Sequence, residues 1–156
     1  MDVTNVGYHF GVLNRRSQAY ITQACKPLGL TYSEYVLLFE LCQRDGCSQD
    51  ELAKRLTADK GLVARNSKTL EEKGFITRTA DASDKRMRRL VVTPKGQALK
   101  RTLTEILQCW VDEITAGMDT AKLDMAFALM EDVAKRASQL DITTIYQERK
   151  DRNERT

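Results

Sequence analysis

The sequence predicts a mainly α-helical protein with a small β-hairpin wing, a winged helix-turn-helix inside a helical dimer. Three observations carry this prediction. Apolar residues recur at helical spacing over most of the chain, whereas residues 75–92 form two strand-like runs around a polar loop. Residues 54–101 hold 14 Lys and Arg against 5 Asp and Glu, a net charge of +9, while the rest of the chain carries −6. Such a basic region between acidic flanks is typical of a site for a polyanion.

Spacing and capping residues indicate the first three helices. A stripe of apolar and small side chains predicts a helix over residues 6–25, and Pro27 ends it because the residue before a proline disfavours helical dihedrals. Thr31-Tyr-Ser-Glu34 is a capping-box pattern, in which each end residue's side chain bonds the other's backbone N–H. Ser48-Gln-Asp-Glu51 repeats this pattern. We therefore expect a second helix after the first box and a short third helix after the second.

A fourth helix and a hairpin are expected next. Asp59 can cap the helix, and Gly74 is a suitable stop. The period then changes, because residues 75–79 and 87–92 resemble two strands and the polar residues 81–86 lie between them. These three segments together predict a wing.

Two long helices are expected after the wing. Thr93 and Pro94 form a strong helix start, an N-cap followed by proline at the first helical position. Gly117 is expected to break this helix, and Asp119 begins the last one. The chain from Asp141 onward is highly charged and is expected to fray.

The fourth helix has two distinct faces. Lys60, Arg65 and Lys68 fall on one side, while Val63 and Leu70 point to the other. A helix needs this arrangement if its back packs on a core and its front enters the major groove of DNA. A short helix, a tight turn and a basic second helix fit the helix-turn-helix pattern, and a basic hairpin directly afterwards makes the pattern more specific.

Several motifs in this region resemble those of the MarR/SlyA family of winged-helix regulators, and the order of elements matches over residues 6–140. The wing motif, followed by an apolar-x-apolar-Thr-x-x-Gly run, is the most specific of them. The motifs are Asp59-Lys-Gly-Leu-Val-Ala-Arg65, Leu70-Glu-Glu-Lys-Gly74-Phe-Ile-Thr-Arg78, Asp84-Lys-Arg86 and Leu90-Val-Val-Thr93-Pro-Lys-Gly96.

The resemblance implies a homodimer that binds a pseudo-palindromic operator in double-stranded DNA. It implies a dimerisation region at residues 1–30 and 94–145 and a DNA-binding lobe at residues 31–93, with residues 146–156 as a charged tail. In the wing, Arg86 is expected to enter the minor groove and Asp84 to steady it. The residues predicted to contact DNA are Lys60, Arg65, Lys68, Asp84, Lys85, Arg86 and Arg88.

The resemblance also implies a response to a small phenolic or aromatic compound, since many members of the family release DNA when they bind one. Arg16, Tyr32 and Tyr35 are the predicted ligand contacts, although the spacing of the tyrosines also fits plain core packing. Asn66 and Ser67 depart from the family pattern, which usually has apolar residues there. This departure predicts either looser packing of the fourth helix or an added polar contact.

Four cysteines leave two interpretations open. Periodicity predicts that Cys42 and Cys109 are buried, while Cys47 precedes a helix start and Cys25 adjoins Lys26, positions that could favour a thiolate. Small hydrophobic packing is the favoured role for all four. With no C-x-x-C pair and one histidine, the chain predicts no metal site and no cofactor. The absence of signal-peptide features and of a long apolar run predicts a cytoplasmic protein.

An enzyme is not predicted, because the sequence holds no Gly-rich phosphate loop, paired-His motif or nucleophile elbow. One alternative to a DNA-binding regulator remains, a winged-helix adaptor that binds protein instead. The +9 region argues against it, since a protein-binding wing does not need concentrated positive charge. A steep loss of DNA affinity with salt would separate the two.

Overall fold

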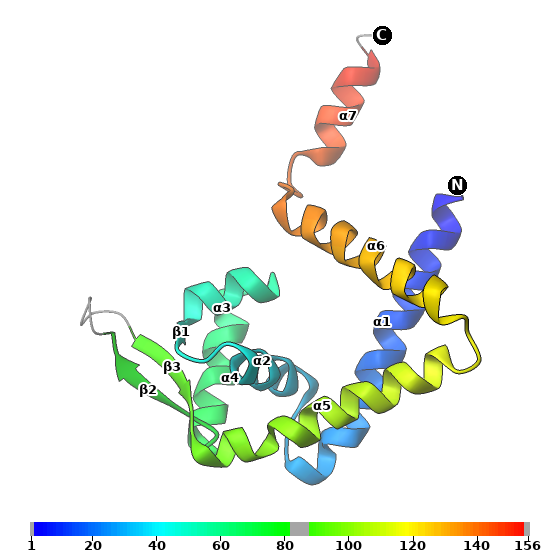
Figure 1. Cartoon of the computed structure of the whole chain (residues 1–156). Coiled ribbons are helices and arrows are strands. Elements are labelled where there is room, and N and C mark those ends of the chain that lie inside the picture. The colour runs from blue at the N-terminus through cyan, green and yellow to red at the C-terminus, as the bar shows by residue number, and fades with distance from the viewer. Residues whose placement is uncertain (1, 82–87, 155–156) are drawn as a thin grey trace. The chain divides into compact units, whose positions relative to one another are not determined.

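The computed structural model describes residues 2–81 and 88–154, which fall into two compact units that divide after Ile114. It confirms the predicted fold class, mainly helical with a small antiparallel sheet (Figure 1). The first unit holds α1 (Val3–Cys25), α2 (Tyr32–Gln43), β1 (Cys47–Ser48), α3 (Gln49–Leu56), α4 (Lys60–Glu72), β2 (Ile76–Ala80), β3 (Arg88–Val92) and all but the last residue of α5 (Pro94–Thr115). The second unit holds α6 (Thr120–Gln139) and α7 (Ile145–Glu154).

Both predicted capping boxes are present. The Thr31 N–H donates to Glu34 Oε2 at 2.8 Å, and the Glu34 N–H donates back to Thr31 Oγ1 at 3.3 Å. The Ser48 box has the same two bonds, at 2.7 and 3.2 Å. Helix α1 ends at Cys25 as expected but starts three residues earlier than predicted, because Asp2 accepts from the Thr4 N–H and caps it.

The sheet has the order β1-β3-β2, with all pairs antiparallel. Strand β2 (Ile76–Ala80) lies one residue later than predicted, and β3 (Arg88–Val92) ends at the predicted residue. Met87, the predicted start of the second strand, lies outside the described residues. The short strand β1, whose Cys47 pairs with Leu90, was not predicted because two residues cannot show an alternation.

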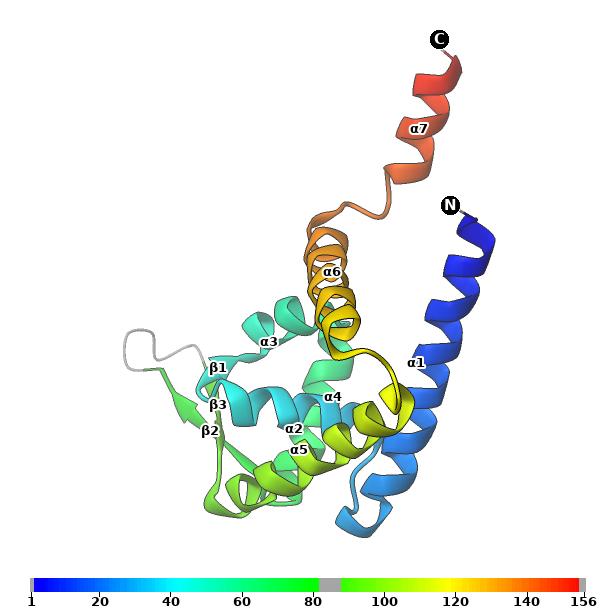
Figure 2. The same ribbon diagram turned by 45° about the vertical axis from the view of Figure 1, so that its right-hand side comes forward.

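The core of the first unit lies among α2, α3, α4, the sheet and α5, which Figure 2 shows gathered together, and the end of α1 adds Ile21 and Cys25 to it. Cys42 is buried in it, as predicted. Cys109 is exposed, and that prediction is wrong. The buried stripe of α5 passes through Leu103, and Cys109 lies about 240° around the helix from it, at about 100° per residue. The largest fully buried side chains are Leu37, Leu38, Leu41, Leu52, Leu70, Ile76, Leu90 and Leu103.

Gly96 fixes how closely the start of α5 approaches the sheet. A Cβ at this position would lie 2.2 Å from Phe75 O and 2.8 Å from Val92 Cγ1. We expect Gly96→Ala to lower the free energy of unfolding by about 1–3 kcal/mol, because a backbone carbonyl cannot move aside cheaply. Urea denaturation is the measurement, and the exposed neighbour Gln97→Ala, expected within about 0.5 kcal/mol of wild type, is the control. An unchanged midpoint for Gly96→Ala would contradict this packing.

The second unit exposes a row of large apolar side chains on α6. Its N-cap is Asp119, as predicted, and Gly117 before it has the left-handed φ of 75°. The charged end of the chain forms helix α7, where fraying was expected. No helix among the described residues is long and apolar enough to cross a membrane. The exposed apolar residues of α6 are Met125, Phe127, Leu129, Met130 and Val133.

Candidate nucleic-acid interface

A tight turn joins α3 to α4. Thr57 adopts a left-handed conformation with φ of 48°, and the Ala58 N–H donates to Ala53 O at 2.9 Å. Asp59 then caps α4 by accepting from the Leu62 N–H at 2.9 Å. These short-range bonds set one helix directly after the other, as a helix-turn-helix requires.

Helix α4 is buried along its back. The exposed fractions of Val63 and Leu70 are 2% and 0%, and between them Ser67 is also fully buried. Ser67 Oγ donates to Val63 O at 2.7 Å, so the residue that departs from the family pattern makes a polar contact within its own helix. Asn66 is half-buried. Buried positions on one side leave the opposite side free to contact a partner.

The exposed front of α4 carries the three predicted cations. Lys60 forms an ion pair with Asp50 at 2.8 Å, and Lys68 lies 3.8 Å from Glu72. Arg65 is exposed and forms no ion pair with any described residue. Of the three cations on this face, Arg65 therefore has the charge and the hydrogen-bond donors that are least engaged by other groups of the protein.

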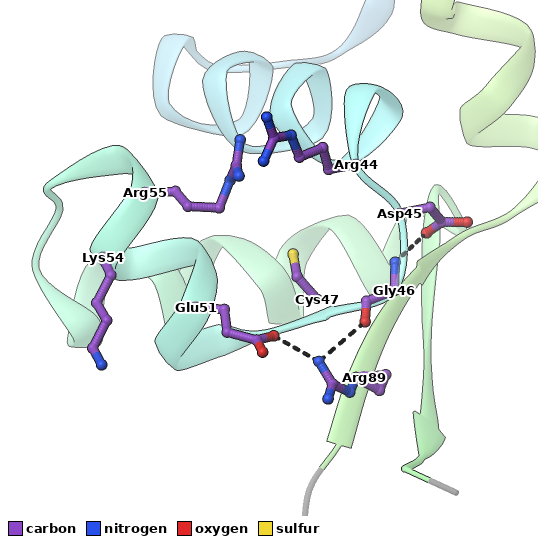
Figure 3. A pocket seen from close by; sticks show the side chains of 8 residues that line it. All are labelled: Arg44, Asp45, Gly46, Cys47, Glu51, Lys54, Arg55 and Arg89. Carbon is purple, nitrogen blue, oxygen red and sulfur yellow. Dashed lines mark hydrogen bonds and ion pairs between the residues drawn. The ribbon is translucent and has the colours of Figure 1, made fainter. Parts of the chain in front are cut away.

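Arg88 and Arg89 point to opposite faces of β3, since successive strand residues alternate. Arg88 is exposed. Arg89 forms a clamp, its Nε bonding Asp81 Oδ2 at 2.5 Å and its Nη1 bonding Glu51 Oε2 at 2.6 Å and Gly46 O at 3.4 Å (the last two drawn in Figure 3). Sequence reasoning identified neither the inward position of Arg89 nor its partners.

The clamp ties the base of the wing to the helix-turn-helix. Asp81 and Arg88 flank residues 82–87, so the predicted contacts Asp84, Lys85 and Arg86 lie outside the described residues. Glu51 also accepts the Ser48 N–H of the capping box. The hydrogen bond from the Ser48 N–H does most to hold the pKa of Glu51 below its ordinary value, and the hydrogen bond from Arg89 adds to this effect. Glu51 thus remains an anion that can hold Arg89.

The two arginines are expected to affect DNA binding differently. Arg88→Gln should leave thermal unfolding unchanged and flatten the salt dependence of DNA affinity by about one unit, because one phosphate contact is lost. Arg89→Gln should lower the melting temperature and weaken DNA binding about tenfold with the salt slope kept, because its charge is already neutralised by Asp81 and Glu51. Thermal melts and DNA titrations at several salt concentrations distinguish the two variants. If both variants had the same melting temperature and the same salt slope, Arg89 would not act by holding the base of the wing.

A buried ion pair fixes the end of α4. Lys73 Nζ lies 2.8 and 2.7 Å from the two carboxylate oxygens of Glu34, and it also donates to Gly29 O at 2.7 Å. The Glu34 side chain is 4% exposed. Burial opposes its ionisation, but the hydrogen bonds from Lys73 and Thr31 outweigh burial and hold the pKa of Glu34 below its ordinary value. The pair therefore links the end of α4 to the start of α2.

The three predicted ligand contacts are not brought together. Tyr32 lines a cavity of about 220 Å³ between α2 and α4, together with Val36, Leu62 and Asn66 among others. Tyr35 lies in the core, where its hydroxyl donates to Leu103 O at 3.3 Å and burial raises its pKa to about 12.

Arg16 is exposed on α1 and lines none of the described cavities. Trp110, which lies in the predicted dimerisation region, contacts α1 of its own chain by stacking on Tyr20 and donating to Ser17 Oγ at 2.9 Å.

Cys25 and Cys47 favour the packing interpretation, whereas the exposed Cys109 does not fit it. Burial raises the pKa of both the Cys25 and the Cys47 thiols, which disfavours the reactive thiolate. Within residues 2–81 and 88–154 there is no group of three or more His, Cys, Asp or Glu side chains arranged to hold a metal ion.

The helix-turn-helix, its exposed basic front and the adjoining hairpin define a winged-helix protein of the DNA-binding class. The model of the MarR family matches residues 30–87. The HTH-type transcriptional regulator BilQ of Clostridium symbiosum is 32% identical over 108 residues, which cover 69% of this chain and 72% of BilQ. The regulator SarZ of Staphylococcus saprophyticus is 30% identical over 118 residues, covering 76% and 80% of the two chains.

The fold is shared with a Listeria monocytogenes protein whose crystal structure was solved in complex with a 26mer DNA. The TM-score is 0.82 at 22% identity, over 90% of this chain and 93% of that one. The chain belongs to the MarR family, and it is a DNA-binding transcriptional regulator.

Proposed function

We propose that this regulator acts as a homodimeric repressor that binds a pseudo-palindromic operator and is released by a small phenolic or aromatic compound. The observation that carries the proposal is the position of Arg65, exposed and without an ion pair among the described residues, on a helix whose other face is buried. A guanidinium held in this way can pair with the O6 and N7 atoms of guanine in the major groove. The chain acts by binding, with no catalytic step.

The remaining predicted contacts have different roles. Lys60 and Lys68 suit phosphates, because a phosphate contact demands less of side-chain geometry than a base contact does. Each would exchange its exposed carboxylate partner for the phosphate. Arg88 extends this basic surface onto β3. The family resemblance supplies the role of Arg86 in the minor groove, with Asp84 and Lys85 beside it. The Listeria protein of the same fold was crystallised with a 26mer DNA, which supports DNA as the partner.

Exposed apolar surface supports the homodimer. On α1, the exposed fractions of Tyr8, Phe10 and Leu13 are 63%, 53% and 43%. On α6, Met125 and Phe127 are 66% and 41% exposed. Soluble monomers seldom expose so many large apolar side chains, and a second copy of the chain would cover them.

The Tyr32 cavity supports the effector. It lies against α4, so a ligand that prefers a different spacing of α2 and α4 would move the recognition helix and weaken DNA binding. A panel of phenolic acids that changed neither thermal stability nor operator affinity would remove this part of the proposal.

Light scattering and footprinting test the proposal as a whole. The protein should be a dimer in dilute solution, and genomic footprinting should give inverted repeats with half-sites about 10 bp between centres, since two recognition helices lie about one DNA turn apart in such dimers. A folded monomer at micromolar concentration, or a single asymmetric half-site, would contradict it.

A further inference from the structure

A second cavity, of about 500 Å³, lies between the C-terminal end of α2, β1 and α3 (Figure 3). It shares no lining residue with the Tyr32 cavity and contains none of the predicted DNA contacts. Its volume lies within the roughly 300–1,000 Å³ typical of small-molecule sites. The residues that give it its chemistry are Arg44, Cys47, Glu51, Lys54, Arg55 and Arg89.

Two guanidinium groups dominate one side of this cavity. In Figure 3 the side chains of Arg44 and Arg55 point toward one another, and the Cys47 sulfur points to the same side. Arg55 is fixed by Glu40, which accepts from its Nε at 2.7 Å and from its Nη2. Arg44 is exposed and forms no ion pair with the described residues. One arginine is thus held in place, and the other is free to close on a ligand.

The carboxylates that line the cavity are already committed. Asp45 Oδ1 accepts the N–H groups of Gly46 and Val92, at 2.9 and 2.8 Å. Glu51 accepts from Arg89 and from the Ser48 N–H. Cys47 adds no negative charge, because burial raises the pKa of its thiol above the ordinary value. The positive charges of Arg44 and Lys54 are therefore left without a carboxylate of their own among the described residues.

We propose that this cavity binds a small organic oxyanion, a carboxylate or a phosphate ester, between Arg44 and Arg55. Planar guanidinium groups hold both kinds of anion through paired N–H donors, and such charge-assisted bonds are the strong ones. The occupant is a small molecule and not the DNA backbone, because Arg44 and Arg55 line this cavity alone among those described. The predicted DNA contact Arg88 lines a neighbouring cavity, which shares only Glu51 and Lys54 with it. This site is independent of the DNA-binding proposal.

Titration of the full-length protein without DNA tests the site. Inorganic phosphate and butyrate are added at constant ionic strength, and the backbone amide signals of Gly46 and Cys47 are followed by NMR. We expect saturable shifts with dissociation constants of order 1–10 mM. Butan-1-ol should give no saturable shift, which separates anion binding from apolar contact. Saturation by one anion and not the other identifies which of the two chemistries the cavity takes.

A matched pair of variants makes the result specific. Arg44→Gln, at an exposed position, should weaken anion binding about tenfold or more. Arg101→Gln on α5, which also removes an exposed arginine, should leave it unchanged. Anions that bind no better than chloride, or that bind Arg44→Gln as they bind wild type, would overturn the proposal. An Arg44→Gln variant that lost DNA affinity while its anion binding was unchanged would also overturn the proposal, because Arg44 would then contact DNA and not the small anion.

Discussion

Replacing Lys73 by methionine should lower the free energy of unfolding by about 3 kcal/mol, because breaking a buried ion pair leaves the remaining charge without compensation. Glu34 is that charge, with its side chain 4% exposed and both carboxylate oxygens bound to Lys73 Nζ. The substitution also takes a donor from Gly29 O. The Lys73 side chain is 32% exposed, which places the expected loss at the lower end for buried pairs.

Urea denaturation measures the loss, and two comparisons isolate its cause. Lys26→Met, an exposed lysine at the end of α1, should stay within about 0.5 kcal/mol of wild type. The double variant Glu34→Gln with Lys73→Met should recover part of the loss, because no uncompensated buried charge remains. A single Lys73→Met variant as stable as Lys26→Met would mean that the pair does not hold α4 to α2.

Arg65→Ala should weaken binding to the operator by about 1–3 kcal/mol, or about 5- to 150-fold, and should relax discrimination at one base pair. The loss is expected to be specific because Arg65 has no ion pair among the described residues to restrain it and lies on the exposed front of α4. Titration against the operator and against variants at each position is the measurement. Arg101→Ala, on α5, is the matched control.

Substitutions in the wing distinguish base contacts from contacts to the DNA backbone. From the family resemblance, Arg86→Ala should weaken binding on most sites and flatten the salt slope by about one unit. Asp84→Ala should give a milder form of the same defect. If Arg65→Ala weakened operator and scrambled DNA by the same factor, Arg65 would be a phosphate contact and not a base contact.

Local signals predicted most of the fold. The capping residues Thr31, Ser48 and Asp59 each begin the helix expected of them, since a cap is formed within three residues along the chain. The two faces of α4 were also predictable, because a period of 3.6 places Val63 and Leu70 on one side.

The contacts that organise the site could not be predicted. Glu34 and Lys73 are 39 residues apart, and Glu51 and Arg89 are 38 apart, so no local pattern brings them together. The same limit applies to Tyr35, because helical spacing alone does not show whether a tyrosine lines a cavity or lies in the core. Its hydroxyl bonds Leu103 O, 68 residues away.

The most direct test of the central claim is the affinity of the wild-type protein for its operator and for a scrambled duplex, measured at several salt concentrations. A DNA-binding regulator should prefer the operator by about 10³-fold or more. On both duplexes the logarithm of its affinity should fall linearly with the logarithm of salt concentration, by about 0.9 for each phosphate contact. Equal affinity for the two duplexes, or no binding at low salt, would contradict the account and favour a winged-helix adaptor that binds protein.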